Sequence, residues 1–425
     1  MVGLDEEKSY KLKQVMMITK ASKKIRVLHI FAPHYKQRFG GPTIQWRYCF
    51  NKWDNPLIDH YVADAKNRCI DLATKAFNFS YQNNQKVATK LERIRWIFDL
   101  FWLLFLKRGA YDVLHFHVLW WGGLLMAAWA KNRNIPTLYE SVLLESDTPG
   151  NIHKQKFGNI KLKLLRSFSG ILAISDSLAA DYKNYGFPKS SIHTLIYSID
   201  TDLFRPPHTI EEKQSLRIKH SIPQNSKVLI FVGSLIERKG IDLLISSFID
   251  AYKEDTSLFL LVVGPRDRKE NPTIDEALIK KLQLMIEENN LRNKVLFTGL
   301  IQDRNELAEI YRASDIFVFP SRQEGLGGVV LEAMSSSLIV VVTDLPVLKG
   351  IITNGENGFN FPLNDKKTFY DAILSASMIS GMKNSIGQNA RNYVLKNLNF
   401  DGWQNQLTQI YINLYTKSNL KVYDS

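Results

Sequence analysis

The strongest constraint on the fold is an alternation, along the whole chain, of short apolar runs with longer stretches of helical periodicity. In the first half, the apolar runs fall at residues 25–31, 112–117, 137–140 and 170–175. Each run is short and continuously apolar, which is typical of parallel strands that are buried on both faces. The helical stretches between them predict right-handed βαβ units. We therefore expect an α/β fold built on a parallel sheet.

The same alternation begins again after the double proline Pro206-Pro207, with strands expected at 228–233, 258–264, 294–299, 315–320 and 339–343. Because 425 residues exceed what one hydrophobic core usually holds, two Rossmann-like domains are the natural solution. The predicted division is a flexible or helical leader over 1–24, an N-terminal domain over 25–205, a C-terminal domain over 206–398 and a final helix over 399–425 that packs back toward the N-terminal domain.

The two cysteines, Cys49 and Cys69, are too few for a disulfide framework and lack the spacing of a metal-binding knuckle. The first 24 residues are polar and charged, and their apolar run is too short for a secretory signal. Both features predict a cytoplasmic protein with reduced thiols.

The formal net charge of +13 is unevenly distributed along the chain. Residues 1–205 contain 30 basic and 17 acidic residues, whereas the remainder is balanced. This asymmetry indicates a polyanionic partner for the N-terminal half, such as anionic lipid, nucleic acid or an acidic substrate.

One segment of that half, residues 91–106, is almost entirely aliphatic and aromatic. As a helix, its most apolar part reaches about 16 Å, too short to span a bilayer. It is either a core helix or one that lies in the membrane interface. Basic flanks favour peripheral binding to an anionic membrane; they are Lys86, Lys90, Arg93, Arg95, Lys107 and Arg108. Nucleic acid is disfavoured, because the aromatic residues are not interleaved with basic ones.

The clearest chemical feature is a glycine-rich turn over 325–328, between the expected strand 315–320 and a following helix. Free amides in such a turn, together with the helix dipole, favour a phosphate. Glu324 and Glu332 bracket the turn. Carboxylates at such positions hold the hydroxyls of ribose and sugars.

This glutamate pair resembles the signature of retaining glycosyltransferases of family 4, also called glycosyl transferases group 1. The resemblance spans about 25–415 and includes further motifs: Phe-Gly-Gly-Pro at 39–42, an Asp-x-x-His-x-His strand at 112–117, a hinge at 198–204, a loop at 231–240, the strand Asp-Ile-Phe-Val-Phe-Pro-Ser at 315–321 and an Asn-Gly turn at 354–359. It implies the GT-B fold, in which two Rossmann-like domains face each other across a cleft.

The resemblance also implies residue roles. Catalysis would depend on Glu324, Lys239, Arg238 and His117. Arg238 and Lys239 would pair with the donor diphosphate, Glu324 and His117 would hold sugar hydroxyls, and Glu332 would hold ribose. The remaining donor contacts would come from Gly41, Gly233, Ser234, Leu326, Gly327, Gly328 and Val329. Retaining transfer by front-face displacement would then need positioning and charge, because neither glutamate is expected beside the anomeric carbon.

Three positions depart from the family pattern. Ser234 stands where many members have arginine, Tyr197-Ser198 replaces Asn-Gly in the hinge, and Gly350 stands where a glutamate is common. The hinge also contains Asp200-Thr201-Asp202, which has the spacing of a metal motif from another glycosyltransferase fold. Its position favours a structural role. We expect no catalytic metal, because cations and a helix N-terminus supply the positive charge.

The sequence thus predicts a retaining hexosyltransferase that uses a UDP- or GDP-sugar and no further cofactor. Its acceptor would be a saccharide or a lipid-linked molecule in cell-surface polysaccharide, lipopolysaccharide or glycolipid synthesis. The N-terminal domain would face the acceptor and the inner membrane surface, and the C-terminal domain would bind the donor. Two alternatives stay open: a GT-B epimerase or phosphorylase, and a non-catalytic sugar-nucleotide-binding or membrane-scaffold subunit.

Overall fold

The structure is a computed structural model that describes residues 24–31, 41–64, 69–74, 89–142, 148–271, 274–381 and 384–423. Contacts within the chain divide it into two units, Met1–Tyr197 with Phe400–Ser425, and Ser198–Asn399. The expected boundary at 205–206 thus falls a few residues after the one that contacts define. Apart from Lys24, the predicted leader lies outside the described residues.

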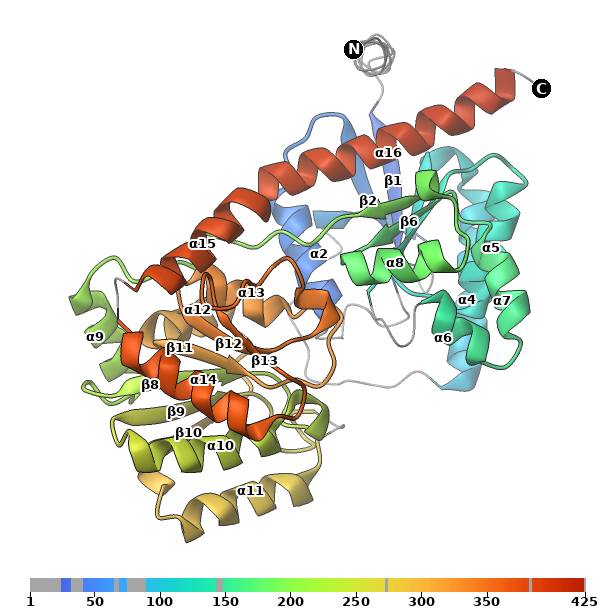
Figure 1. Ribbon diagram of the computed structural model, residues 1–425. Helices are drawn as coiled ribbons and strands as arrows, with labels where there is room; N and C mark the ends of the chain where they lie inside the picture. The colour runs from blue at the N-terminus through green and yellow to red at the C-terminus, as the bar shows by residue number, and fades with distance from the viewer. Residues whose placement is uncertain are drawn as a thin grey trace. The chain divides into compact units, whose positions relative to one another are not determined.

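The first unit contains a seven-stranded sheet in the order β3-β2-β1-β4-β5-β6-β7 (Figure 1). All neighbouring strands are parallel except β2 and β3. The strands are β1 Ile25–Ile30, β2 Ile58–Asp64, β3 Cys69–Leu72, β4 Val113–Phe116, β5 Thr137–Ser141, β6 Gly170–Ala173 and β7 Ile192–Thr194. The four strands expected here are confirmed. The sequence did not predict β2, β3 or β7. In β2, buried and half-buried side chains alternate along part of the strand, so it lacks a continuous apolar run.

The helices of the first unit include α4, whose start the sequence specifies locally. Thr89 forms a capping box, in which its hydroxyl accepts the Glu92 amide and the Glu92 carboxylate accepts the Thr89 amide. The last helix, α16, packs against β1 and β4 (Figure 1). The helices are α2 Gly41–Lys52, α4 Lys90–Leu106, α5 Trp121–Lys131, α6 Pro149–Lys154, α7 Gly158–Leu165, α8 Asp176–Asn184 and α16 Phe400–Tyr423.

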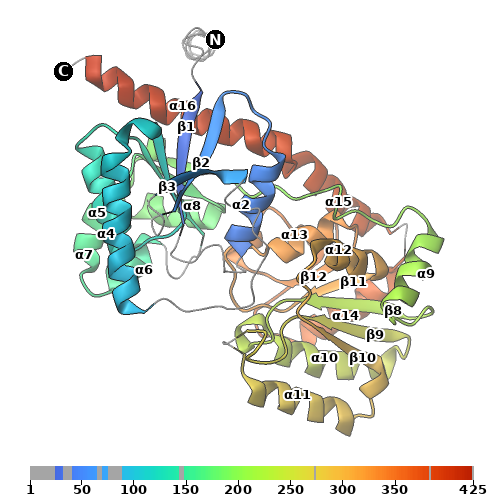
Figure 2. The ribbon, with the colours of Figure 1, turned by 180° about the vertical axis from the view of Figure 1, so that it is seen from behind.

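The second unit contains a six-stranded, fully parallel sheet in the order β10-β9-β8-β11-β12-β13 (Figure 2). Its strands are β8 Lys227–Val232, β9 Leu258–Val263, β10 Val295–Gly299, β11 Ile316–Phe319, β12 Ile339–Thr343 and β13 Phe359–Phe361. The five strands expected here are confirmed, and only the three-residue β13 escaped prediction. Its helices are α9 Ile210–Lys219, α10 Ile241–Glu254, α11 Glu276–Glu288, α12 Arg304–Ala313, α13 Gly328–Ser335, α14 Lys366–Ile379 and α15 Ser385–Asn397.

The strand order reverses between β1 and β4 in the first unit and between β8 and β11 in the second. Open α/β sheets bind ligands outside the carboxyl ends of the strands at such a switch point. The loops that leave β8 and β11 are therefore the positions where the second unit is expected to hold a ligand. They carry most of the site residues predicted from the sequence.

Candidate active site

The loops that follow β8 and β11 are held together by a contact that only glycine permits. Gly240 has φ +71°, and a Cβ added there would lie 1.9 Å from the carbonyl oxygen of Pro320. The amide of Arg322 donates to the carbonyl of Arg238 at 2.8 Å. The two loops therefore form one continuous surface at the switch point of the second unit.

Lys239 and Glu324 form a buried ion pair on this surface. The Lys239 Nζ donates to Glu324 Oε1 at 2.5 Å, and the two side chains are only 14% and 9% exposed. The hydroxyl of Ser321 donates to the same carboxylate oxygen at 2.5 Å, and the ammonium lies 5.1 Å from the centre of the Phe319 ring. Burial lowers the pKa of Lys239, and Glu324 opposes that shift. The pair is thus fixed in position and largely removed from water.

Arg238 lies beside this pair and is exposed to solvent. Its Nη1 donates to the carbonyl oxygen of Gln323 at 2.6 Å, so the guanidinium is attached to the β11 loop. Elsewhere in the β8 loop, Ser234 Oγ accepts a hydrogen bond from Asn271 at 3.4 Å. The carbonyl of Gly233 leaves no space for a side chain at position 264. The β8 loop thus begins with a tightly packed turn at Gly233 and ends with the two cationic side chains of Arg238 and Lys239.

The N-terminus of α13 provides the second positive element of the site. Gly327 precedes the helix with φ +76°, and Gly328 is exposed, with no atom within 4 Å of an added Cβ. Val329 is half-buried, while Leu326 is buried and anchors the loop. Open space above the amides of a helix N-terminus is a favourable position for an anion.

Glu332, one turn into α13, is 8% exposed and already has protein partners. Arg304 donates to its Oε1 at 3.1 Å, and the Tyr311 hydroxyl donates to its Oε2 at 3.3 Å. Burial raises the pKa of Glu332, while Arg304 and Tyr311 oppose the shift. Each carboxylate oxygen can accept two bonds, so lone pairs remain for a ligand. Our sequence reasoning missed Arg304 and Tyr311, which are more than twenty residues away from Glu332 in the chain.

The residues predicted in the first unit lie at its own switch point. Gly41 is the first residue of α2, and the preceding part of its motif falls outside the described residues. His117 follows β4 and is 3% exposed. Its Nδ1 lies 2.5 Å from Glu140 Oε2, and its Nε2 lies 2.8 Å from His29 Nδ1. A hydrogen bond from this ring to a donor sugar, as predicted, would have to replace one of these two contacts.

The sequence reasoning also missed Glu140 and His29. Both lie inside expected strands, so we gave their polar side chains no role among the apolar neighbours. The sequence does contain one indication, a glutamate near the end of an otherwise apolar strand. A buried charge needs a partner, so this residue could have been expected to form polar contacts. In the structure, Glu140 accepts hydrogen bonds from Trp46 at 2.9 Å and Tyr197 at 2.7 Å.

The possible metal ligands belong to the first unit, whereas the donor loops belong to the second. Over the described part of the chain, sets of three such side chains occur as His29, His115 and His117, and as Asp64, Cys69 and Asp71. In the hinge motif, Asp200 Oδ1 accepts the amide of Leu203 at 3.1 Å. That hydrogen bond closes a turn, so Asp200 has a structural role there. The absence of a catalytic metal stays a prediction.

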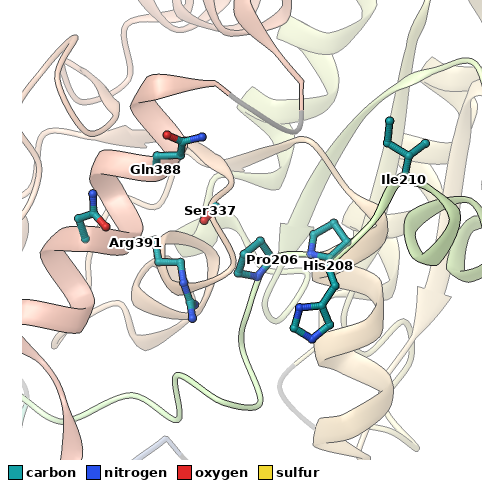
Figure 3. Close-up of a pocket in the computed structure, with 8 residues that line it drawn as sticks. Pro206, His208, Ile210, Ser337, Gln388 and Arg391 are labelled. Carbon is teal, nitrogen blue, oxygen red and sulfur yellow. The ribbon is translucent and has the colours of Figure 1, made fainter.

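A cavity of about 610 Å³ in the second unit (Figure 3) is distinct from these loops. Ser337, in its wall, lies two residues before the start of β12, so the cavity lies at the amino edge of the sheet. Its Arg391 already donates to the carbonyl oxygens of Ser335 and Phe204. The lining residues are Pro206, Pro207, His208, Ile210, Ser337, Gln388, Arg391 and Asn392. Because ligands of such sheets bind at the carboxyl edge, this cavity does not mark the donor site.

Comparison with known proteins assigns the chain to a class. The family described as Glycosyl transferases group 1 matches residues 212–393, and Glycosyltransferase Family 4 matches residues 76–203. Mannosylfructose-phosphate synthase from Agrobacterium fabrum is 32% identical over 38% of this chain and 34% of its own length. The lipopolysaccharide core biosynthesis mannosyltransferase LpsB from Rhizobium meliloti is 27% identical over 55% of this chain and 64% of its own.

The solved structure of HepE from Anabaena, in complex with UDP, has the same fold, with a TM-score of 0.71 at 16% identity over 91% of this chain and 99% of that one. The chain belongs to the group 1 glycosyltransferases, with the GT-B fold of two Rossmann-like units. The family and the fold predicted from the sequence are confirmed. The alignments span about a third of the first relative and just under two thirds of the second. Among the described helices, none is long and apolar enough to cross a membrane.

Proposed function

We propose that the chain is a retaining glycosyltransferase that moves a hexosyl group from a nucleotide-diphosphate sugar to a saccharide or lipid-linked acceptor at a membrane surface. The observation that carries this proposal is the arrangement around the second unit's switch point. Lys239, Arg238 and the N-terminus of α13 supply positive charge from adjacent loops. A diphosphate, which is compact and doubly charged, matches this arrangement better than a neutral ligand does.

The proposed mechanism depends on charge and positioning. As the bond to the anomeric carbon breaks, negative charge grows on the diphosphate, and preorganised cations stabilise it. When the donor binds, Lys239 can turn from Glu324 toward a phosphate oxygen, which frees the carboxylate for a sugar hydroxyl. Glu332 would hold the ribose with its remaining lone pairs. The bound UDP in HepE and the lipopolysaccharide role in the name of LpsB support a UDP- or GDP-sugar donor and a cell-surface glycan product.

A thermal-shift panel of UDP-, GDP- and ADP-sugars tests donor binding. A ligand present at 100 times its Kd should stabilise the protein by about 2.7 kcal/mol. Glu332→Ala should abolish most of the shift given by the preferred donor, whereas Asp202→Ala in the hinge should leave it intact. The reverse result would mean that the donor does not bind at the loop before α13.

Turnover tests the catalytic part separately. Glu324→Gln should lower kcat by about 10²–10³, the usual effect of removing one preorganised polar contact from a transition state, while nucleotide binding persists. Release of nucleoside diphosphate is the readout. If no nucleotide sugar is consumed with or without acceptor while binding is retained, the chain is a binding subunit.

The membrane part of the proposal comes from α4, which has two apolar faces. Leu100, Leu103 and Leu104 are buried in the core of the first unit. The opposite side of the helix, which in a solvated helix should be polar, is apolar and exposed. We call this the α4 face: Leu91, Ile94, Phe98, Phe101, Trp102, Phe105 and Leu106, exposed by between 39% and 79%. This burial pattern supports a helix that contributes one face to the core and offers the other to a membrane interface.

Neighbouring helices extend the α4 face. Trp121 and Leu125 of α5, and Phe157 and Ile160 at α7, are also exposed, and α4 and α5 lie side by side in both ribbon views (Figure 2). Exposed basic side chains occur on the same helices or just after them, namely Arg95, Lys107, Arg108, Lys131, Arg133, Lys154, Lys156 and Lys163. Exposed apolar residues on helices that also carry basic side chains match the interface of an anionic bilayer.

Vesicle co-sedimentation tests this surface. The chain should bind vesicles of phosphatidylglycerol and phosphatidylcholine, and Phe98→Ser with Trp102→Ser should reduce binding at least tenfold. Ile218→Ser with Leu284→Ser, which removes exposed apolar residues from the second unit, is the matched control and should change little. Self-association through the α4 face without lipid binding would contradict the proposal.

A further inference from the structure

The geometry points to a metal site of the zinc type in the first unit, formed by His29, His115 and His117. It belongs to the first unit, whereas the donor loops belong to the second, and it does not depend on the proposed function. β1 and β4 are paired so that His29 lies beside His115, and His117 follows two residues later on the same face of the sheet. All three side chains are at most 3% exposed. One nitrogen of each ring lies within 4.8 Å of one nitrogen of both others.

The first supporting observation is that each ring has a partner on its other nitrogen. His117 Nδ1 lies 2.5 Å from a Glu140 oxygen, His29 Nε2 lies 2.7 Å from His60 Nδ1, and His115 Nδ1 lies 2.7 Å from the Tyr411 hydroxyl. Histidines that bind metals usually donate their second N–H to an outer partner of this kind, which fixes the ring and its tautomer. The arrangement leaves Nδ1 of His29 and Nε2 of both His115 and His117 as the inner nitrogens.

The second supporting observation is the state of those inner nitrogens. His115 Nε2 is buried and has no hydrogen-bond partner among the described residues, which is costly for a polar atom. His29 Nδ1 and His117 Nε2 face each other at 2.8 Å. If both rings donate outward, two lone pairs point at each other. A cation between the rings relieves that repulsion and uses the unpaired nitrogen of His115.

The ligand type indicates which ion fits. Neutral imidazoles suit zinc and other late first-row metals rather than magnesium or calcium. Zinc–nitrogen bonds of about 2.0–2.1 Å place tetrahedral ligand atoms about 3.3 Å apart, so His29 and His117 need to separate by about 0.5 Å. An ion here would link β1 to β4 and, through Tyr411, to α16. Its role would be structural.

Metal content and spectroscopy test the inference on the full-length chain. Protein expressed with added zinc should contain about one zinc per chain by mass spectrometry after extensive dialysis. After removal of the metal with dipicolinate, Co(II) should produce the visible absorption bands of a nitrogen-ligated tetrahedral ion, and zinc should displace them. Zinc should also raise the Tm of the metal-free protein.

His115→Gln should abolish the Co(II) bands and the zinc-dependent rise in Tm. His193→Gln, a half-buried histidine on β7 outside the cluster, is the matched control and should retain both. Wild-type protein without stoichiometric zinc and without Co(II) bands would overturn the inference, whether or not the variants fold. It would instead establish a metal-free hydrogen-bonded chain from His60 through His29 and His117 to Glu140. Loss of the bands in both variants alike would overturn it as well.

Discussion

At the scale of single residues, burial and hydrogen bonding act in opposite directions on the carboxylates of the second unit. For Asp255, burial alone would raise the pKa, but hydrogen bonds from the Ser257 hydroxyl and amide, Lys227 and Ser377 outweigh it and lower the pKa to about 2. For Glu332, burial prevails and raises the pKa. Asp255 therefore stabilises the fold in its charged form, whereas burial disfavours the charged form of Glu332.

Asp255→Asn should lower the free energy of unfolding by about 1–2 kcal/mol at pH 7, because hydrogen bonds to a charged group are the stronger ones. The folded-state pKa is depressed, so this contribution is present above the usual pKa near 4 and is lost as the pH falls toward about 2. Urea unfolding from pH 2 to pH 7 measures it. Asp371→Asn, at an exposed position, is the control. A penalty that does not change with pH would contradict the assignment.

The family resemblance placed Lys239 and Glu324 in the same predicted donor site, and in the structure they form an ion pair. The sequence could not predict their further partners. Ser321 was visible in the same loop, but the Arg304 and Tyr311 contacts to Glu332 depend on how α12 packs against α13. The same holds for His29 and Glu140, whose pairing with His117 requires the register of three strands. Local patterns give positions along an element, and tertiary packing decides which side chains meet.

At the scale of elements, the candidate site depends most on the backbone of Gly240, the residue that joins η4 (Glu237–Lys239) to α10. Gly240 combines a positive φ with a close approach to Pro320. Gly240→Ala should therefore combine the strain of a left-handed residue, about 1 kcal/mol, with a clash against backbone. We expect a loss of at least about 3 kcal/mol in unfolding free energy and a loss of donor binding in protein that still folds.

Gly355→Ala is the matched control for this prediction. Gly355 has φ +76°, but an added Cβ there meets no atom within 4 Å. This variant should show the strain alone, about 1 kcal/mol, with donor binding intact. Chemical denaturation and the thermal-shift panel measure both variants. Equal losses in the two would mean that the contact with Pro320 is unimportant.

Helix α4 shows what the sequence pattern of a single element cannot predict. Its sequence is apolar around most of the circumference, so periodicity could not say which face is buried. In the structure, Leu100, Leu103 and Leu104 face the sheet and are buried in the core of the first unit, whereas Phe98 and Trp102 are exposed. By contrast, strands such as β9, with every residue buried, were predictable because no face had to be chosen.

At the scale of the whole molecule, the first unit needs both ends of the chain. Trp403 of α16 is 3% exposed, and its ring centre lies 5.6 Å from that of Trp46 in α2. Gln404 donates to Asp54 at 2.6 Å. Trp403→Ala should cost about 3–5 kcal/mol, as other buried aromatic truncations do, and the loss should fall on the first unit.

Scanning calorimetry can assign that loss to a unit. We expect two transitions, of which Trp403→Ala lowers one. Phe369→Ala, a fully buried ring in α14 of the second unit, should lower the other. If both variants lower the same transition by similar amounts, the two units unfold together. The two units defined by contacts would then not be independent units of unfolding.

The return of α16 to the first unit also sets an order of events during translation. The strands of that unit leave the ribosome early, but the helix that covers β1 and β4 is made only after residues 198–399 have been synthesised. The second unit can therefore complete its fold first, while the older part of the nascent chain still exposes an uncovered apolar surface. A premature stop before Phe400 would leave that surface open to chaperones and proteases, even though every residue of the second unit had been made.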